Sequence, residues 1–194
     1  MILGITGGIG TGKSTVLNIL KEKYDFLVLE SDKIAHEVMN PGNDAYNEIV
    51  DCFGTDILND DNTINRKKMS SIVFEDKNKL EKLNSIVHPA VIDEIKLRIE
   101  NGKQMGRENF AIEAALLIES GCHKICDKVW YIYADEEVRI KRLMKSRNMT
   151  REQIEAVMKN QMQKEFFEEN TTDIVDNSKS LEDTFMQVQK LLEF

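Results

Sequence analysis

The chain has 194 residues, of which 41% are hydrophobic and 31% charged, and its net charge is −8. This length allows one domain with a sizeable insertion, and the acidic balance argues against a general nucleic-acid binder, which needs a broad basic surface. No apolar run approaches the ~20 residues that cross a bilayer, and the opening MILGIT has no basic region ahead of an apolar stretch. We therefore expect neither a membrane span nor a secretory signal. Three cysteines, an odd and sparse number, favour a reducing, cytoplasmic location.

The first half of the chain alternates short apolar runs with helical patterns. The expected elements are a strand at 1–6, a helix at 13–24, a strand at 26–29, and helices at 32–39, 45–53 and 66 to about 100. Within the last of these helices, Pro89 is an expected interruption and Gly102 an expected stop.

The second half continues the alternation. The expected elements are strands at 110–118 and 129–134, a helix at 135–147, a helix from Thr150 to about 169, a strand at 174–175 and a closing helix after Ser180. Thr150 with Gln153 forms a capping-box pattern, which marks a helix start. Strands that alternate with helices predict an α/β fold with a parallel sheet covered on both faces.

Two long helical stretches interrupt this rhythm, at about 32–105 and about 136–172. We interpret them as insertions that close over a site. The chain would then be a single domain, residues 1–194, whose core comprises about 1–31, 106–135 and 173–194. No Pro- or Ser-rich linker divides it.

Residues 4–15, GITGGIGTGKST, carry the most specific motif. Gly7, Gly12, Lys13 and Ser14 fit G-x-x-x-x-G-K-[ST] between a predicted strand and a predicted helix. Glycines let backbone N–H groups turn inward, and the helix start adds partial positive charge, so this phosphate loop would cradle a nucleoside triphosphate. Lys13 would contact the β- and γ-phosphates, and the Ser14 hydroxyl would contact Mg²⁺. The expected nucleotide-binding residues are Gly10, Thr11, Gly12, Lys13, Ser14 and Thr15.

Several classes of protein use such a loop. The guanine-reading N-K-x-D pattern is missing, and its nearest approach, residues 78–81, falls in a helical pattern rather than after a strand. A switch GTPase is therefore disfavoured. A compact chain with two insertions suits a small-molecule kinase, which must close over its substrate to exclude water.

A kinase also needs a carboxylate near the acceptor hydroxyl and positive charge near the transferred phosphoryl group. Asp32 follows the second strand, at the edge of the sheet where ligands bind in open α/β folds. The alternative is that Asp32 only caps the next helix. Arg139, Arg142 and Arg147 share one predicted helix and could supply the charge, or they could form a solvated basic stripe.

At this point the chain resembles the dephospho-CoA kinase family over nearly its whole length. The matching stretches, in order, are GITGGIGTGKST, Glu30–Asp32 with Ile34–His36, Pro41-Gly42, Tyr46, Phe53-Gly54, Ile64–Arg66, Leu83-Asn84, His88-Pro89, Leu116–Glu119, Arg142-Leu143, Arg147, Gln161-Met162 and Asp173–Asn177. No single match is decisive, but their ordered series at matching spacing is.

The resemblance implies a P-loop kinase with an acceptor-binding insertion and a lid, which uses ATP and Mg²⁺ to phosphorylate the ribose 3′-hydroxyl of dephospho-CoA. Asp32 would be the base or positioning group, and Arg142 would approach the phosphates from the lid. His36, Arg66 and His88 would lie on the acceptor side. The expected partners are these small molecules alone, with no nucleic acid and no membrane. We expect a monomer, although the sequence does not exclude an oligomer.

The chain departs from the family pattern at several places. Glu30 replaces the first Asp of D-x-D, Val157 stands where many members have arginine, and 164–172 is about a residue longer than usual. The last two leave the lid contacts to ATP open, and whether Glu30, Glu113 or Glu119 supports Mg²⁺ is also open. The rival interpretations are another small-molecule kinase of the nucleoside-monophosphate type, or a nucleotide-binding regulatory module without transfer chemistry.

Overall fold

A computed structural model describes residues 1–193, which divide into two compact units. Unit 1 comprises Met1–Leu29, Arg107–Glu119 and the chain from His123 onward. Unit 2 comprises Glu30–Gly106 and Ser120–Cys122. Among the helices of residues 1–193, none is both long and apolar enough to span a membrane.

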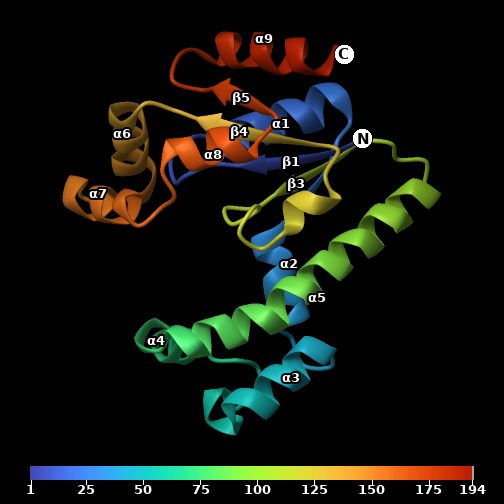
Figure 1. The fold of residues 1–194 in the computed structure, drawn as a ribbon, viewed down its shortest axis with the longest axis vertical. Helices are drawn as coiled ribbons and strands as arrows, with labels where there is room; N and C mark the ends of the chain where they lie inside the picture. Colours follow the sequence, from blue (N-terminus) through green and yellow to red (C-terminus); the bar gives the residue numbers. More distant parts are fainter. Residues whose placement is uncertain (194) are drawn as a thin grey trace. The chain divides into compact units, whose positions relative to one another are not determined.

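The centre of unit 1 is a five-stranded parallel sheet in the order β2-β3-β1-β4-β5 (Figure 1). Its strands are β1 (Ile2–Thr6), β2 (Leu27–Glu30), β3 (Phe110–Glu113), β4 (Lys128–Tyr133) and β5 (Asp173–Asp176). The middle strand β1 pairs on one side with β3, Ile2 opposite Phe110, and on the other with β4, Leu3 opposite Lys128. The predicted α/β class is confirmed.

Successive residues of a strand point to opposite faces of the sheet, and in these strands the residues on both faces are largely apolar. Helices therefore cover both faces of the sheet. The helices of unit 1 are α1 (Lys13–Tyr24), α6 (Glu136–Arg147), α7 (Arg151–Lys159), α8 (Lys164–Asn170) and α9 (Leu181–Leu192). On one face, Leu20 of α1 and Val188 of α9 pack in one core cluster with Trp130 of β4. On the other face, Phe167 of α8 stacks on Tyr131, with ring centroids 4.6 Å apart.

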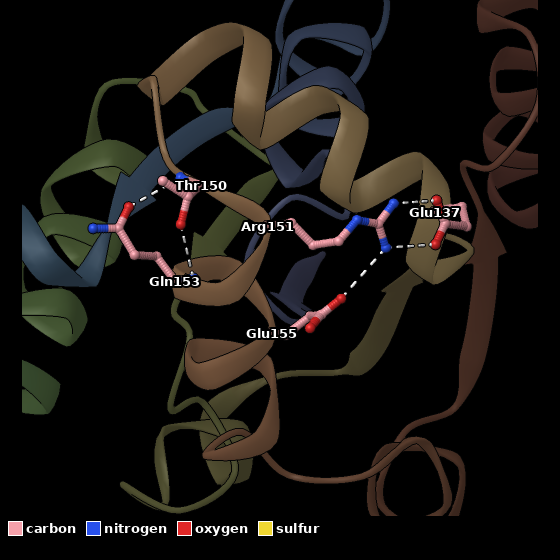
Figure 2. A network of polar contacts seen from close by, with 5 residues as sticks. All are labelled: Glu137, Thr150, Arg151, Gln153 and Glu155. Atoms are coloured by element: carbon pink, nitrogen blue, oxygen red, sulfur yellow. Dashed lines mark hydrogen bonds and ion pairs between the residues drawn. The ribbon is translucent and has the colours of Figure 1, made fainter.

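The segment predicted to be a lid folds as a helix pair followed by α8. Helices α6 and α7 pack through Leu143 and Ile154, and Ile9 of the phosphate loop packs against the same cluster. The predicted capping box is confirmed (Figure 2): the Gln153 N–H donates to Thr150 Oγ1 at 3.3 Å, and the Thr150 N–H donates to Gln153 Oε1 at 3.0 Å. The prediction of one helix to about 169 was wrong, because the chain leaves the helix between α7 and α8.

Unit 2 is built around one long helix, α5 (Lys77–Gln104), seen in green in Figure 1. The other helices of this unit are α2 (Ser31–Val38), α3 (Asp44–Phe53), a 3₁₀ turn (Thr55–Ile57) and α4 (Arg66–Glu75), and all three α-helices pack on α5. The buried stripe of α5 is Ile86, Val87, Val91, Ile95 and Ile99.

Helix α5 has neither the expected interruption at Pro89 nor the expected end at Gly102. The helix continues through Pro89, whose ring is exposed. Proline removes one backbone hydrogen bond from the helix, but buried apolar residues before and after Pro89 stabilise the helix through their packing. Gly102 is buried inside the helix; the glycine that follows its end is Gly106, at φ 82°.

The strand β3 is shorter than expected. The sequence predicted a strand at 110–118, and the strand ends at Glu113.

Candidate active site

The phosphate loop joins β1 to α1, and its backbone requires glycine at two places. Gly7 and Gly12 have φ values of 148° and 88°. A Cβ atom on Gly7 would lie 2.5 Å from the Ile132 carbonyl oxygen, and one on Gly12 would lie 2.0 Å from Asn177 Nδ2. Both contacts are too short for any side chain, so the loop passes against β4 and against the chain after β5 only because these residues are glycine.

Lys13 begins α1 and turns its amine back over the loop. Its Nζ donates to the Gly7 carbonyl at 3.0 Å and lies 3.5 Å from Glu113 Oε1. The two side chains are only 17% and 16% exposed, so this cation is held in place at the carboxyl ends of β1 and β3. Glu113 thus stands next to the phosphate loop, whereas Ser14, the next residue of α1, is exposed.

Arg142 reaches the loop from α6. Its guanidinium donates to the Asn177 carbonyl at 2.8 Å and, more weakly, to the Thr11 carbonyl at 3.4 Å. It borders a groove of about 870 Å³. Its walls include Thr15, Asn18 and Ile19 of α1 and Phe185 of α9. The groove therefore runs from the end of the phosphate loop along α1.

Three further side chains hold the loop, and the sequence predicted no contact for them. Asn177 is 2% exposed, and its Nδ2 donates to the Thr11 carbonyl at 2.8 Å. Gln161 Oε1 accepts from the Ile9 N–H at 3.0 Å, and Arg139 Nε donates to the Ile9 carbonyl at 2.8 Å. These contacts join residues more than a hundred positions apart, so no local pattern reveals them. The signals in the sequence were that Gln161 and Asn177 fall within family-like stretches and that Arg139 is one of three arginines on one predicted helix.

Asp32 belongs to unit 2, in the first turn of α2. The helix begins one residue earlier than expected, at Ser31, and Glu30 occupies the capping position. Asp32 is exposed and makes no capping hydrogen bond. The interpretation of Asp32 as the cap was therefore wrong, and its carboxylate stands in solvent where a substrate hydroxyl could approach it.

Two of the three residues expected on the acceptor side line one hollow in unit 2. His36 of α2 and Arg66, the first residue of α4, border a space of about 620 Å³. Its remaining wall is mixed, with amides from Asn40, Asn59 and Asn65 and apolar side chains from Met39, Ile64, Met69, Val73 and Leu83. His88, partly buried on α5, is not in this wall. The hollow combines a cation with a long apolar surface.

Burial lowers the pKa of His88 below its ordinary value near 6.5. The unfolded chain then binds more protons than the folded chain as the pH falls through about 6.5, so we expect the stability of the protein to decrease there. Chemical denaturation at pH 7.5 and pH 5.5 measures the decrease. The free energy of unfolding should change less between the two pH values in His88→Gln than in the wild type. An equal change in both proteins would show that His88 is not the group responsible.

The remaining predicted positions are Glu30, Glu119, Val157 and the stretch 164–172. Glu30 pairs with Lys33 at 2.7 Å, and Glu119 is an exposed residue beyond β3. Val157 is 37% exposed on α7. The stretch 164–172 contains α8, whose Phe167 packs on the sheet. Their roles toward Mg²⁺ and ATP stay predictions.

Comparison with known proteins identifies the family. A family model described as dephospho-CoA kinase matches residues 1–183. The curated dephospho-CoA kinase of Lactobacillus johnsonii is 41% identical over 191 residues, 98% of this chain and 96% of that protein. The one from Carboxydothermus hydrogenoformans is 38% identical, over 99% and 93% of the two chains.

A solved structure of a dephospho-CoA kinase has a similar fold. The dephospho-CoA kinase from Campylobacter jejuni superposes with a TM-score of 0.71 at 26% identity, and the match covers 99% of this chain and 95% of that one. The expected P-loop kinase fold is confirmed. The sequence match and the fold lead to one conclusion: this chain belongs to the dephospho-CoA kinase family.

Proposed function

We propose that this protein transfers the γ-phosphoryl group of ATP to the ribose 3′-hydroxyl of dephospho-CoA, giving CoA and ADP, the last step of coenzyme A synthesis. The observation that carries this proposal is the phosphate loop with the Lys13 amine held at Gly7, in a chain that the dephospho-CoA kinase family model matches over residues 1–183.

Unit 1 provides the nucleotide side. Backbone N–H groups of the loop and the start of α1 face anionic phosphates, and the nucleoside of ATP would lie in the groove beside Thr15 and Arg142. The Ser14 hydroxyl and the Glu113 carboxylate are oxygen donors of the kind that Mg²⁺ prefers, so they would hold it directly or through water. Bound Mg²⁺ would neutralise phosphate charge. Lys13 would shift from Glu113 to the β- and γ-phosphates.

Unit 2 provides the acceptor side. The exposed Asp32 carboxylate would position the 3′-hydroxyl and take its proton as the new P–O bond forms. Arg66 and His36 would face the diphosphate of dephospho-CoA, because a guanidinium binds phosphate oxygens through paired hydrogen bonds. The apolar wall would take the pantetheine arm. His88 would support this side from α5.

The wider organisation follows from this assignment. Residues of about 32–105 would act as the acceptor-binding insertion and about 136–172 as the lid of a single kinase domain. The enzyme would work in the cytoplasm as a monomer on small molecules.

A coupled ADP-release assay with Mg-ATP, with and without dephospho-CoA, tests the proposal. We expect ADP release that depends on the acceptor, and a product heavier by one phosphoryl group. Turnover only with nucleoside monophosphates would instead identify a kinase of that type. ATP binding without turnover on any acceptor would identify a regulatory module. Either result would overturn the proposal.

A further inference from the structure

Two arginines of α6, one turn apart, approach opposite parts of the phosphate loop. Arg142 lies toward Thr15 and Asn177, in the groove along α1. Arg139 lies toward Gly8 and Ile9, at the end of the loop that follows β1. A single helix therefore offers two cations to two different parts of a bound triphosphate.

The contact of Arg139 with the loop is close. A Cβ atom on Gly8 would lie 2.6 Å from Arg139 Nη2 and 2.7 Å from Gln161 Oε1, so the guanidinium and the amide rest on the bare glycine backbone. Arg139 donates from Nε to the Ile9 carbonyl and from Nη2 to Gln161 Oε1, at 2.8 and 3.0 Å. These bonds use two of the five N–H groups of a guanidinium.

Both known acceptors of Arg139 are neutral. Among residues 1–193, no carboxylate lies within ion-pairing distance of this side chain, although it is partly buried. Burial lowers the pKa of the Arg139 guanidinium, which nevertheless remains charged at neutral pH. The nearby carboxylate of Glu136 attracts this cation but is exposed and beyond ion-pairing distance, so the partly buried guanidinium is suited to an anionic ligand.

Arg151 shows the opposite arrangement in the same lid (Figure 2). It is exposed, and its guanidinium binds both carboxylate oxygens of Glu137 at 2.8 Å and also Glu155. Its charge is neutralised within the protein. Arg139 differs from it, because the Arg139 guanidinium rests on the phosphate loop and bonds only neutral groups there.

The loop itself shows which phosphate Arg139 would meet. A phosphate-loop lysine reaches the β- and γ-phosphates, and Lys13 Nζ lies at the Gly7 carbonyl, one residue from Gly8. Thr15, at the other end of the motif, borders the groove with Arg142. The triphosphate would thus run from the Thr15 end toward Gly7 and Gly8, with its terminal phosphate nearest Arg139.

We propose that Arg139 is a catalytic residue of this chain, which contacts the transferring γ-phosphoryl group, while Arg142 binds the nucleoside side of ATP. The inference rests on the proposed kinase function. During transfer, the bond from the γ-phosphorus to the bridging oxygen breaks, the bond to the acceptor oxygen forms, and ADP leaves with the electron pair. The guanidinium stabilises the negative charge on the equatorial oxygens in between.

The test compares Arg139→Gln with Arg142→Gln and with Arg151→Gln as the matched lid control. We expect Arg139→Gln to lower kcat by roughly 10- to 100-fold, because Lys13 retains part of the charge, with little change in the KM for ATP. Arg142→Gln should mainly raise that KM. Arg151→Gln should leave both constants near those of the wild type.

A binding measurement distinguishes a catalytic from a tethering role. MgADP with aluminium fluoride imitates the planar transferring group, so Arg139→Gln should weaken this complex by about the factor lost in kcat and leave MgADP affinity unchanged. Tm should fall only slightly, through the lost hydrogen bonds to Ile9 and Gln161. Equal weakening of MgADP binding, or unchanged kcat, would overturn the proposal. The titration needs no acceptor, so it tests Arg139 separately from the proposed function. If the wild type does not phosphorylate dephospho-CoA, the proposed function is wrong, and the affinity for the fluoride complex still tests the role of Arg139.

Discussion

Lys13→Ala should lower kcat by roughly 100- to 1,000-fold, the loss that follows removal of one strong donor at a developing charge. The physical reason is the position of the amine, which hydrogen bonds to the Gly7 carbonyl and stands beside Glu113 at the carboxyl ends of β1 and β3. Without it, the β- and γ-phosphates would lose one full positive charge next to the carboxylate of Glu113. Steady-state kinetics with Mg-ATP and dephospho-CoA measure the loss.

Lys21→Ala is the matched control, because Lys21 is an exposed lysine in the last turn of the same helix. It removes one charge from α1 at a distance from the loop and should keep kcat near the wild-type value. Glu113 loses its ammonium partner in Lys13→Ala, so Tm is measured for both variants and the assay is run well below the lower one. A folded Lys13→Ala enzyme with near-wild-type kcat would contradict the role of Lys13.

The fold was largely predictable because its signals are local. The motif residues of the loop place the start of α1 at Lys13. The capping-box pattern at Thr150 and the residue Ser180 mark two further helix starts, and the structure shows reciprocal capping hydrogen bonds at both. Where the prediction failed, tertiary packing outweighed the local signal. Pro89 does not end α5, because the apolar residues before and after it are buried along one stripe.

The site was predictable only in part, for the same reason. The G-K-[ST] residues belong to a contiguous motif, so their place at the end of β1 followed from the sequence. Asn177 and Gln161 hold the loop through bonds that span 166 and 152 residues. The contacts of Arg139 also depend on the fold, since the sequence left open whether the arginines of α6 supply charge to the phosphoryl group or form a solvated basic stripe. Contacts between residues so far apart cannot be predicted from local sequence patterns.

Asp32→Asn should lower kcat by roughly 100-fold or more, the usual contribution of a positioned general base, while ATP binding remains close to that of the wild type. Asparagine keeps the shape of the side chain but cannot take the proton of the 3′-hydroxyl. Stability should hardly change, because Asp32 is exposed and makes no capping hydrogen bond. The remaining effect is the loss of one carboxylate from the first turn of α2, about 0.3–1 kcal/mol.

Asp44→Asn separates that electrostatic effect from catalysis. Asp44 is an exposed carboxylate in the first turn of α3, in the same unit, and no side chain caps that helix either. Both variants therefore remove one charge from the start of one helix, and urea unfolding should show similar small losses. Only Asp32→Asn should lose turnover. If the two variants kept the same kcat, Asp32 would be a helix-start carboxylate and the base would have to be sought elsewhere in the acceptor unit. If kcat fell only in Asp32→Asn, with ATP affinity kept, the loss would lie in the transfer step itself.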